Sequence, residues 1–253
     1  MFTAAHLRQP RRDRAILAGS LVALVALAWA TLWLWEGSSY RAFLGHAGGA
    51  GPLPLEAALF SLGWVLMIVA MMLPSSIPLV MTFRALVARR RQPTTLVVLL
   101  LLGYLIVWSA FGLGAWLLDR GIHAGVEAVP VLAEHPELIL ASTLAVAGLW
   151  QFSPIRDRCL DECRSPLGFV MNRWRGVAER RESLAMGIAH GAFCVGCCWS
   201  LMLVMFGVGL GSATLMLALG ALTAIEKNLP WGRRLTRPLG IVLVLAAVYV
   251  VAA

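Results

Sequence analysis

The sequence predicts an all-α membrane protein, a polytopic bundle of about seven transmembrane helices with its N-terminus in the cytoplasm. Of its 253 residues, 60% are hydrophobic and 13% are charged, whereas a soluble domain carries about 25% charged residues. The hydrophobic residues form long runs, and about 20 helical residues cross a hydrocarbon core of about 30 Å. This composition excludes a single soluble globule and a disordered chain. We expect residues 1–253 to form one integral membrane domain.

Seven apolar runs are the expected spans. They are residues 15–35, 57–86, 94–118, 138–152, 184–208, 213–225 and 239–251. The fourth, sixth and seventh runs are shorter than about 20 residues, so they must extend into flanking residues or cross only part of the bilayer. Residues 155–183 separate the fourth and fifth runs and are expected to form a cytoplasmic loop rich in arginine and cysteine.

The placement of basic residues predicts the orientation. Nineteen of the 21 Lys and Arg side chains lie before the first run or in the segments that end or follow the second, fourth and sixth runs. The positive-inside rule makes that side cytoplasmic, which puts the C-terminus outside if there are seven spans. The formal net charge of +8 therefore reflects membrane topology. The expected environment is the lipid bilayer, and no nucleic-acid partner is expected.

The five cysteines do not predict a disulfide framework, because their number is odd and none lies in a predicted outside loop. Cys159 and Cys163 lie in the cytoplasmic loop, whereas Cys194, Cys197 and Cys198 lie in the fifth run. The spacing of Cys159 and Cys163 puts both thiols on one face of a helical turn. Such a pair could hold part of a metal site.

The fifth run carries the densest group of candidate metal ligands. With His190 at zero and about 100° per residue, Cys194 falls at about +40°, Cys197 at about −20° and Cys198 at about +80°. Thiolates and imidazole suit Cu(I) or Zn(II), and neighbouring methionines favour copper. Because a buried histidine in lipid needs a partner, we interpret the group as a metal site. Ordinary packing of sulfur-containing side chains is the alternative.

The second run offers another helix for this site. Two methionines precede Pro74, and Pro78 follows one turn later. Each proline removes a backbone hydrogen bond, so the freed carbonyl needs a partner or a cavity. Counted along each helix, Met71 and His190 lie at the same depth, about 9 Å from the inner face. The residues of this run that are predicted to complete the site are Met71, Met72 and Ser75.

Two expectations concern contacts between helices. Gly187, Gly191 and Gly196 predict close approach of another helix, as small residues do in membrane proteins. Glu226 ends the sixth run beside Lys227, and we expect these two side chains to pair at the membrane boundary. A ligand or proton-carrying role for the Glu226 carboxylate is the alternative.

Four stretches occur in order along most of the chain. They are Met71-Met72-Leu-Pro-Ser-Ser-Ile-Pro78, Cys159-x3-Cys163-Arg-Ser-Pro-Leu-Gly-Phe169, His190-Gly-x2-Cys194-x2-Cys197-Cys198-Trp199 and Glu226-Lys227-x2-Pro230. In these stretches the chain resembles a bacterial family of predicted metal-binding integral membrane proteins of unknown function. The resemblance implies metal binding without naming the metal. We accordingly expect a multi-pass protein of the bacterial inner (cytoplasmic) membrane.

The leading hypothesis is a membrane protein that binds a soft metal for delivery or transport, with copper as Cu(I) favoured over zinc. The expected ligands are His190, Cys194, Cys197, Cys198, Cys159, Cys163, Met71 and Met72. A cytosolic metal donor would load the site, and a membrane-protein acceptor would receive the metal, because no ATP-binding motif is evident. The hypothesis includes no catalytic turnover.

Two alternatives remain at this point. A membrane thiol–disulfide oxidoreductase is one, because Cys194-x2-Cys197 has redox spacing. A structural subunit of a larger membrane complex, in which the cysteines only pack, is the other.

Overall fold

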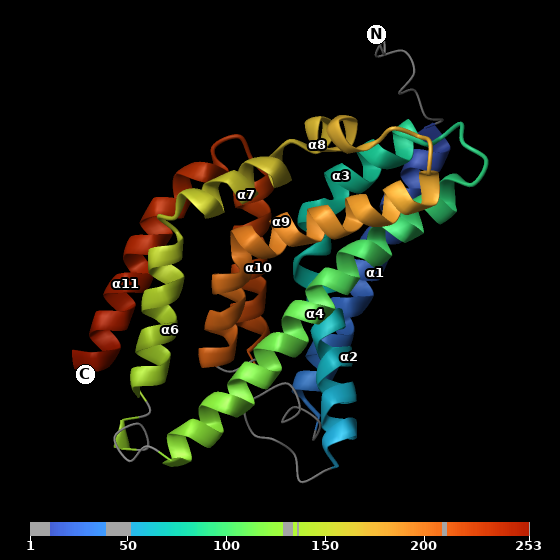
Figure 1. The fold of residues 1–253 in the computed structure, drawn as a ribbon. Helices are drawn as coiled ribbons and strands as arrows, with labels where there is room; N and C mark the ends of the chain where they lie inside the picture. The colour runs from blue at the N-terminus through green and yellow to red at the C-terminus, as the bar shows by residue number, and fades with distance from the viewer. Residues whose placement is uncertain (1–10, 39–51, 129–133, 136, 209–211, 253) are drawn as a thin grey trace.

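The computed structural model describes residues 11–38, 52–128, 134–135, 137–208 and 212–252, and within these ranges every regular element is a helix (Figure 1). The predicted all-α fold is therefore confirmed. The helices in chain order are α1 Arg11–Glu36, α2 Leu53–Met71, α3 Leu73–Leu86, α4 Pro93–Ala128, α6 Glu137–Trp150, α7 Pro154–Arg164, α8 Pro166–Arg173, α9 Glu179–Val208, α10 Ala213–Asn228 and α11 Thr236–Ala252, with a 3-10 turn, η3, at Gly232–Leu235 before α11.

Five helices in the described ranges are long and apolar enough to cross a membrane. They are α1, α2, α4, α9, and α11 together with η3. The pair α6 and α7, bent by 65°, makes a sixth if it counts as one broken span. The chain is thus a multi-pass membrane protein, but the predicted number of seven spans is not confirmed. Helix α10 has only 16 residues and packs against α1, α2, α3, α7 and α9.

The second predicted span is broken at Met72, between α2 and α3. Pro74 has no N–H, so the carbonyl of Ala70 loses its helical partner four residues later. The indole Nε1 of Trp29, in α1, donates to this Ala70 oxygen at 3.1 Å. The freed carbonyl is satisfied by a neighbouring helix, as the membrane interior requires. The break leaves Met72 at the bend.

Helices α4 and α9 approach closely through glycines. A Cβ atom on Gly187 would clash with the backbone of Leu100 in α4, and one on Gly191 would lie 3.0 Å from Cβ of Val107. Gly103 of α4 meets the backbone of α9 in the same way. The prediction that the fifth run uses small residues to contact another helix is confirmed for Gly187 and Gly191.

Residues 155–183 are not a simple loop, because two short helices, α7 and α8, occupy much of the segment. Each begins with a proline, Pro154 or Pro166, at a position where a helix needs no N–H donor. The Ser153 hydroxyl caps α7 by accepting from the N–H of Ile155 at 3.2 Å. Figure 1 shows α7 and α8 at one end of the bundle, where α7 packs against α9.

Candidate metal centre

Four buried thiols from two helices gather where α7 packs against α9. The thiol of Cys163, on α7, interacts with the thiols of Cys194 and Cys197 on α9. Cys198, one turn after Cys194, interacts with the Cys194 thiol. All four side chains are buried. We call Cys163, Cys194, Cys197 and Cys198 the thiol cluster.

Gly196 of α9 allows α7 to pack close enough for Cys163 to reach the thiol cluster. A Cβ atom on Gly196 of α9 would lie 2.6 Å from Sγ of Cys159, so a larger residue there would push α7 away. Cys159 itself is half-buried on α7, one turn before Cys163, and it packs against this glycine. The two cysteines of α7, which lie one turn apart, therefore differ in position. Cys163 belongs to the thiol cluster, and Cys159 lies at its edge.

The bend between α2 and α3 adds a thioether to the cluster. Sδ of Met72 lies 3.8 Å from Sγ of Cys198. Met71 is equally buried, but its side chain turns toward α10, where its Cβ and Cγ lie close to Gly220. Of the two predicted methionines, Met72 is the one beside the thiols.

His190 lies one turn before Cys194 on α9, enclosed by aromatic rings. Its imidazole stacks on Tyr104 at 5.5 Å between ring centroids and meets Phe169 edge to face at 5.5 Å. Nε2 is 3.0 Å from Oγ of Ser76, and that hydroxyl donates to the carbonyl of Met72. We therefore assign the ring proton to Nε2, which donates to this hydroxyl.

This tautomer leaves Nδ1 of His190 as an acceptor with an open lone pair. Nδ1 is buried and has no hydrogen-bond partner among the described residues. A buried polar atom without a partner is rare in native structures. The hydroxyl of Tyr104 lies 3.3 Å from Sγ of Cys194, so the ring stacked on His190 also touches the thiol cluster. Ser76 and Tyr104 were not among the sequence candidates.

Lys227 places a buried ammonium group at this site. The sequence predicts that Lys227 pairs with Glu226, and this prediction is wrong. The ammonium does not pair with Glu226. Instead, Nζ lies 3.0 Å from Sγ of Cys194 and 3.4 Å from Oγ of Ser75. A signal was available in the sequence, because Lys227 is the only lysine in a chain whose 21 basic residues are otherwise arginines.

Glu226 pairs with Arg156 of α7 instead, at 2.7 Å, and both side chains are buried. The hydroxyl of Thr236 donates to the other carboxylate oxygen at 3.0 Å and accepts from Arg156 at 3.1 Å. The guanidinium of Arg164 also donates to the backbone carbonyls of Glu226 and Leu229. These bonds hold α7, which carries Cys163, to the end of α10, which carries Lys227.

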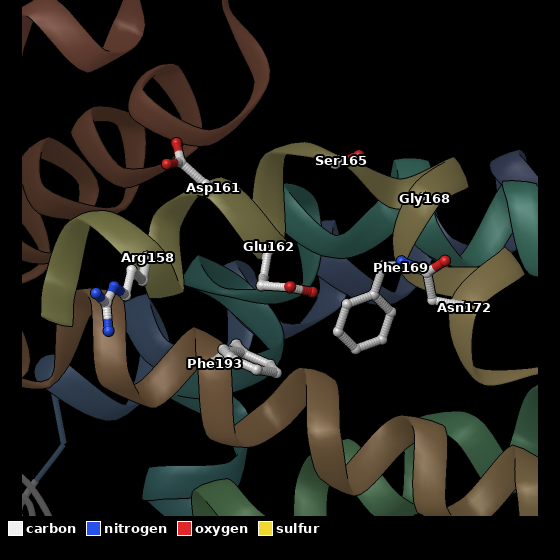
Figure 2. A pocket seen from close by; sticks show the side chains of 8 residues that line it. All are labelled: Arg158, Asp161, Glu162, Ser165, Gly168, Phe169, Asn172 and Phe193. Carbon is white, nitrogen blue, oxygen red and sulfur yellow. The ribbon is translucent and has the colours of Figure 1, made fainter.

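A pocket of about 480 Å³ opens beside this region, between α7, α8 and α9 (Figure 2). Its lining residues are Arg158, Asp161, Glu162, Ser165, Gly168, Phe169, Asn172 and Phe193. Glu162 and Phe193 are the chain neighbours of Cys163 and Cys194, so the pocket lies next to the thiol cluster. Arg173 closes one side by pairing with Glu162 at 3.2 Å and lying 4.0 Å from the Phe169 ring centroid.

The donor atoms fit a soft monovalent metal better than a hard one, since four thiols, a thioether and an imidazole are soft or borderline ligands. Across the described ranges, no group of three or more His, Cys, Asp or Glu side chains already stands in a metal-holding arrangement. The thiols of Cys197 and Cys198 turn toward the carbonyl of Cys194, at 3.1 and 2.8 Å. Rotation about their χ1 bonds would be needed to direct these sulfurs to one ion.

The helices and the buried sulfur atoms together define a multi-pass membrane protein equipped for soft-metal chemistry. Residues 61–250 match the model of the PpoB2 family, which is described as a copper chaperone, and the chain belongs to this family. No curated protein and no solved structure matches the chain significantly. The membership makes the protein one that handles copper and implies that it binds copper and passes it to partners. It agrees with the resemblance to membrane metal-binding proteins.

Proposed function

We propose that this protein binds Cu(I) inside the membrane at the thiol cluster and delivers it to a membrane-protein acceptor. The presence of Cys163 in one buried cluster with Cys194, Cys197 and Cys198 carries the proposal. It brings thiols from two helices into one buried group beside Sδ of Met72. Cu(I) favours thiolate and thioether ligands.

The proposed roles of the predicted residues differ. Cys163, Cys194, Cys197 and Cys198 are the thiolate ligands, with Met72 as an additional thioether ligand. His190 supplies Nδ1 from the adjacent turn. Cys159 is the outer thiol that receives the ion first, since it is half-buried and one turn from Cys163. Met71 supports the site through its packing on Gly220.

We also propose that this end of the molecule faces the cytoplasm of a bacterial cell, with residues 1–253 as one membrane domain. Two basic segments are joined there: Arg90 pairs with Glu179 at 3.0 Å, and Arg180 donates to Gln92 at 2.6 Å. The positive-inside rule assigns such an end to the cytoplasm. A cytosolic donor would then load Cys159, and the acceptor would take copper within the membrane.

Copper content is the test of the site. The full chain is purified in detergent under reducing conditions, loaded with reduced copper and analysed by mass spectrometry, beside Cys194→Ala/Cys197→Ala. The matched control is Met186→Leu, which changes a buried thioether of α9 that packs in another part of the core. We expect near-stoichiometric copper in the wild type and in the control, and loss in the double variant. Equal copper in all three proteins, or none in the wild type, would overturn the proposal.

His190→Ala separates copper binding from thiol redox chemistry. Loss of an imidazole ligand is expected to weaken Cu(I) binding, whereas a thiol–disulfide oxidoreductase would tolerate this change. Retention of wild-type Cu(I) affinity in His190→Ala would remove His190 from the ligand set. It would then favour the alternative function, a thiol–disulfide oxidoreductase.

A further inference from the structure

We infer that Lys227 is the built-in counter-charge of the copper–thiolate complex and that it favours Cu(I) over Zn(II) at this site. The inference rests on the proposed function, because it takes the thiol cluster as the copper ligands. It assigns Lys227 a specificity-determining role, in which the residue acts on the metal through its charge and does not ligate it.

The ammonium is surrounded by sulfur and hydroxyl acceptors. Its three N–H donors face three acceptors, namely Sγ of Cys194 at 3.0 Å, Oγ of Ser75 at 3.4 Å and Sγ of Cys198 at 4.0 Å. Lys227 is only 5% exposed. A buried cation in a membrane protein is costly and is retained where its charge has a use.

The neighbouring carboxylate does not neutralise this charge. Glu226 is engaged by Arg156 and Thr236. None of the ion pairs formed by the described residues includes Lys227. The positive charge is therefore directed at the thiols, which become its counter-ions when they are thiolates.

The choice of lysine is itself informative. The other 20 of the 21 basic residues are arginines, including the buried Arg156, which binds Glu226 and Thr236 with two of its nitrogens. Arginine suits such a planar pair of oxygen acceptors, whereas lysine carries a compact point charge on a flexible stem. An ammonium group can remain beside a metal–thiolate complex because it does not need two acceptors in a fixed planar arrangement. Lysine therefore suits this site, where the acceptors are sulfur atoms that also bind the metal.

Charge arithmetic gives the direction of the effect. Cu(I) held by the four thiolates of the cluster has a net charge of minus three, and burying an uncompensated charge in a low-dielectric interior is costly. The Lys227 ammonium reduces the net charge of the site to minus two. At any given number of thiolates, a Zn(II) complex is one unit less negative than the Cu(I) complex, so the same ammonium stabilises it less.

A purely structural role predicts something different. Through Ser75 and Cys194, Lys227 connects α10 to α3 and α9. If that connection were its only contribution, its removal would loosen the site and weaken Cu(I) and Zn(II) binding alike. The ratio of the two affinities therefore separates the roles, and both are measured on the same folded protein.

The experiment compares the wild type, Lys227→Gln, Lys227→Arg and Cys194→Ala/Cys197→Ala, each as the full chain in detergent under reducing conditions. Cu(I) affinity is measured by competition with a chromogenic Cu(I) chelator, and Zn(II) affinity with a fluorescent Zn(II) chelator. Methionine is avoided at position 227 because its thioether could ligate copper. Glutamine removes the charge and keeps a donor for Ser75, and arginine keeps the charge in another shape.

We expect Lys227→Gln to lower the Cu(I)-to-Zn(II) affinity ratio about tenfold or more, which corresponds to about 1.4 kcal/mol. Lys227→Arg should keep the ratio within a few-fold of the wild type. The inference is overturned if Lys227→Gln leaves the ratio unchanged, or if Lys227→Arg, with its charge retained, loses the Cu(I) preference. The second comparison applies even if the glutamine variant does not fold. Failure of the proposed function is distinct, since it would show as no Cu(I) binding in the wild type or full binding in the cysteine variant.

Discussion

Cys163 on α7 and Cys194 on α9 share one buried cluster and their thiols interact, although 30 residues and a second short helix separate them in the chain. Two features hold them together. Gly196 lets α7 settle on α9, and the Arg156–Glu226 pair fastens α7 to α10. The copper site that we propose therefore depends on the packing of α7 against α9 and α10 as much as on the cysteines themselves.

The two cysteines of α7 should behave differently. Cys163→Ala removes a thiol from the cluster and is expected to lower Cu(I) affinity at least about tenfold, a difference of about 1.4 kcal/mol. Cys159→Ala, one turn away on the same helix, is the matched control and should keep equilibrium affinity near that of the wild type. Chelator competition measures both. Equal losses in the two variants would place Cys159 inside the ligand set, contrary to the geometry.

The buried ion pair of Arg156 and Glu226 is expected to be important for stability. Glu226→Gln leaves the buried guanidinium without its counter-charge, which typically costs about 3–5 kcal/mol. Arg233→Gln removes a half-exposed partner of Asp157 and Asp161 and should change stability by less than about 1 kcal/mol. Denaturation by SDS titration of both variants gives the comparison. Similar stability of the two proteins would show that the buried pair is dispensable.

The bend between α2 and α3 should depend on the indole of Trp29. Trp29→Phe keeps an aromatic ring but removes the donor to the Ala70 carbonyl, and a buried acceptor without a partner costs about 1–3 kcal/mol. Trp33→Phe, on the same helix, is the control, because Trp33 is 62% exposed. Thermal unfolding in detergent should show a lower midpoint for Trp29→Phe only. Matching midpoints would mean that another donor can satisfy this carbonyl.

Close packing of α4 and α9 should make Gly187 intolerant of a methyl group. Gly187→Ala would place Cβ against the Leu100 carbonyl, and overpacking of this kind costs about 1–3 kcal/mol. Gly114→Ala is the matched change in α4, since nothing lies within 4 Å of the added Cβ there, and it should be neutral or slightly stabilising. The yield of monodisperse protein and its thermal midpoint report the difference. A stable Gly187→Ala protein would contradict the observed contact.

Composition and periodicity alone predicted the helical membrane fold and the soft-donor face of α9, because both depend on residues close together in one segment. They did not predict the bend at Met72 as a break in a span, nor that α10 would pack against five other α-helices. An apolar run has the same composition whether lipid or protein surrounds it. The seven-span prediction went beyond what length and hydrophobicity support for α10 and the α6–α7 pair.

The tertiary structure decided which neighbours meet. In the sequence Glu226 and Lys227 are adjacent opposite charges, yet in the fold the first binds Arg156 and the second faces Cys194. Successive residues of a helix point about 100° apart, so they enter different surroundings. The same rotation separates Met72 from Met71. Residue type and spacing specified the donor atoms of this protein, and the packing of α3, α7 and α10 on α9 determined which of them share one site.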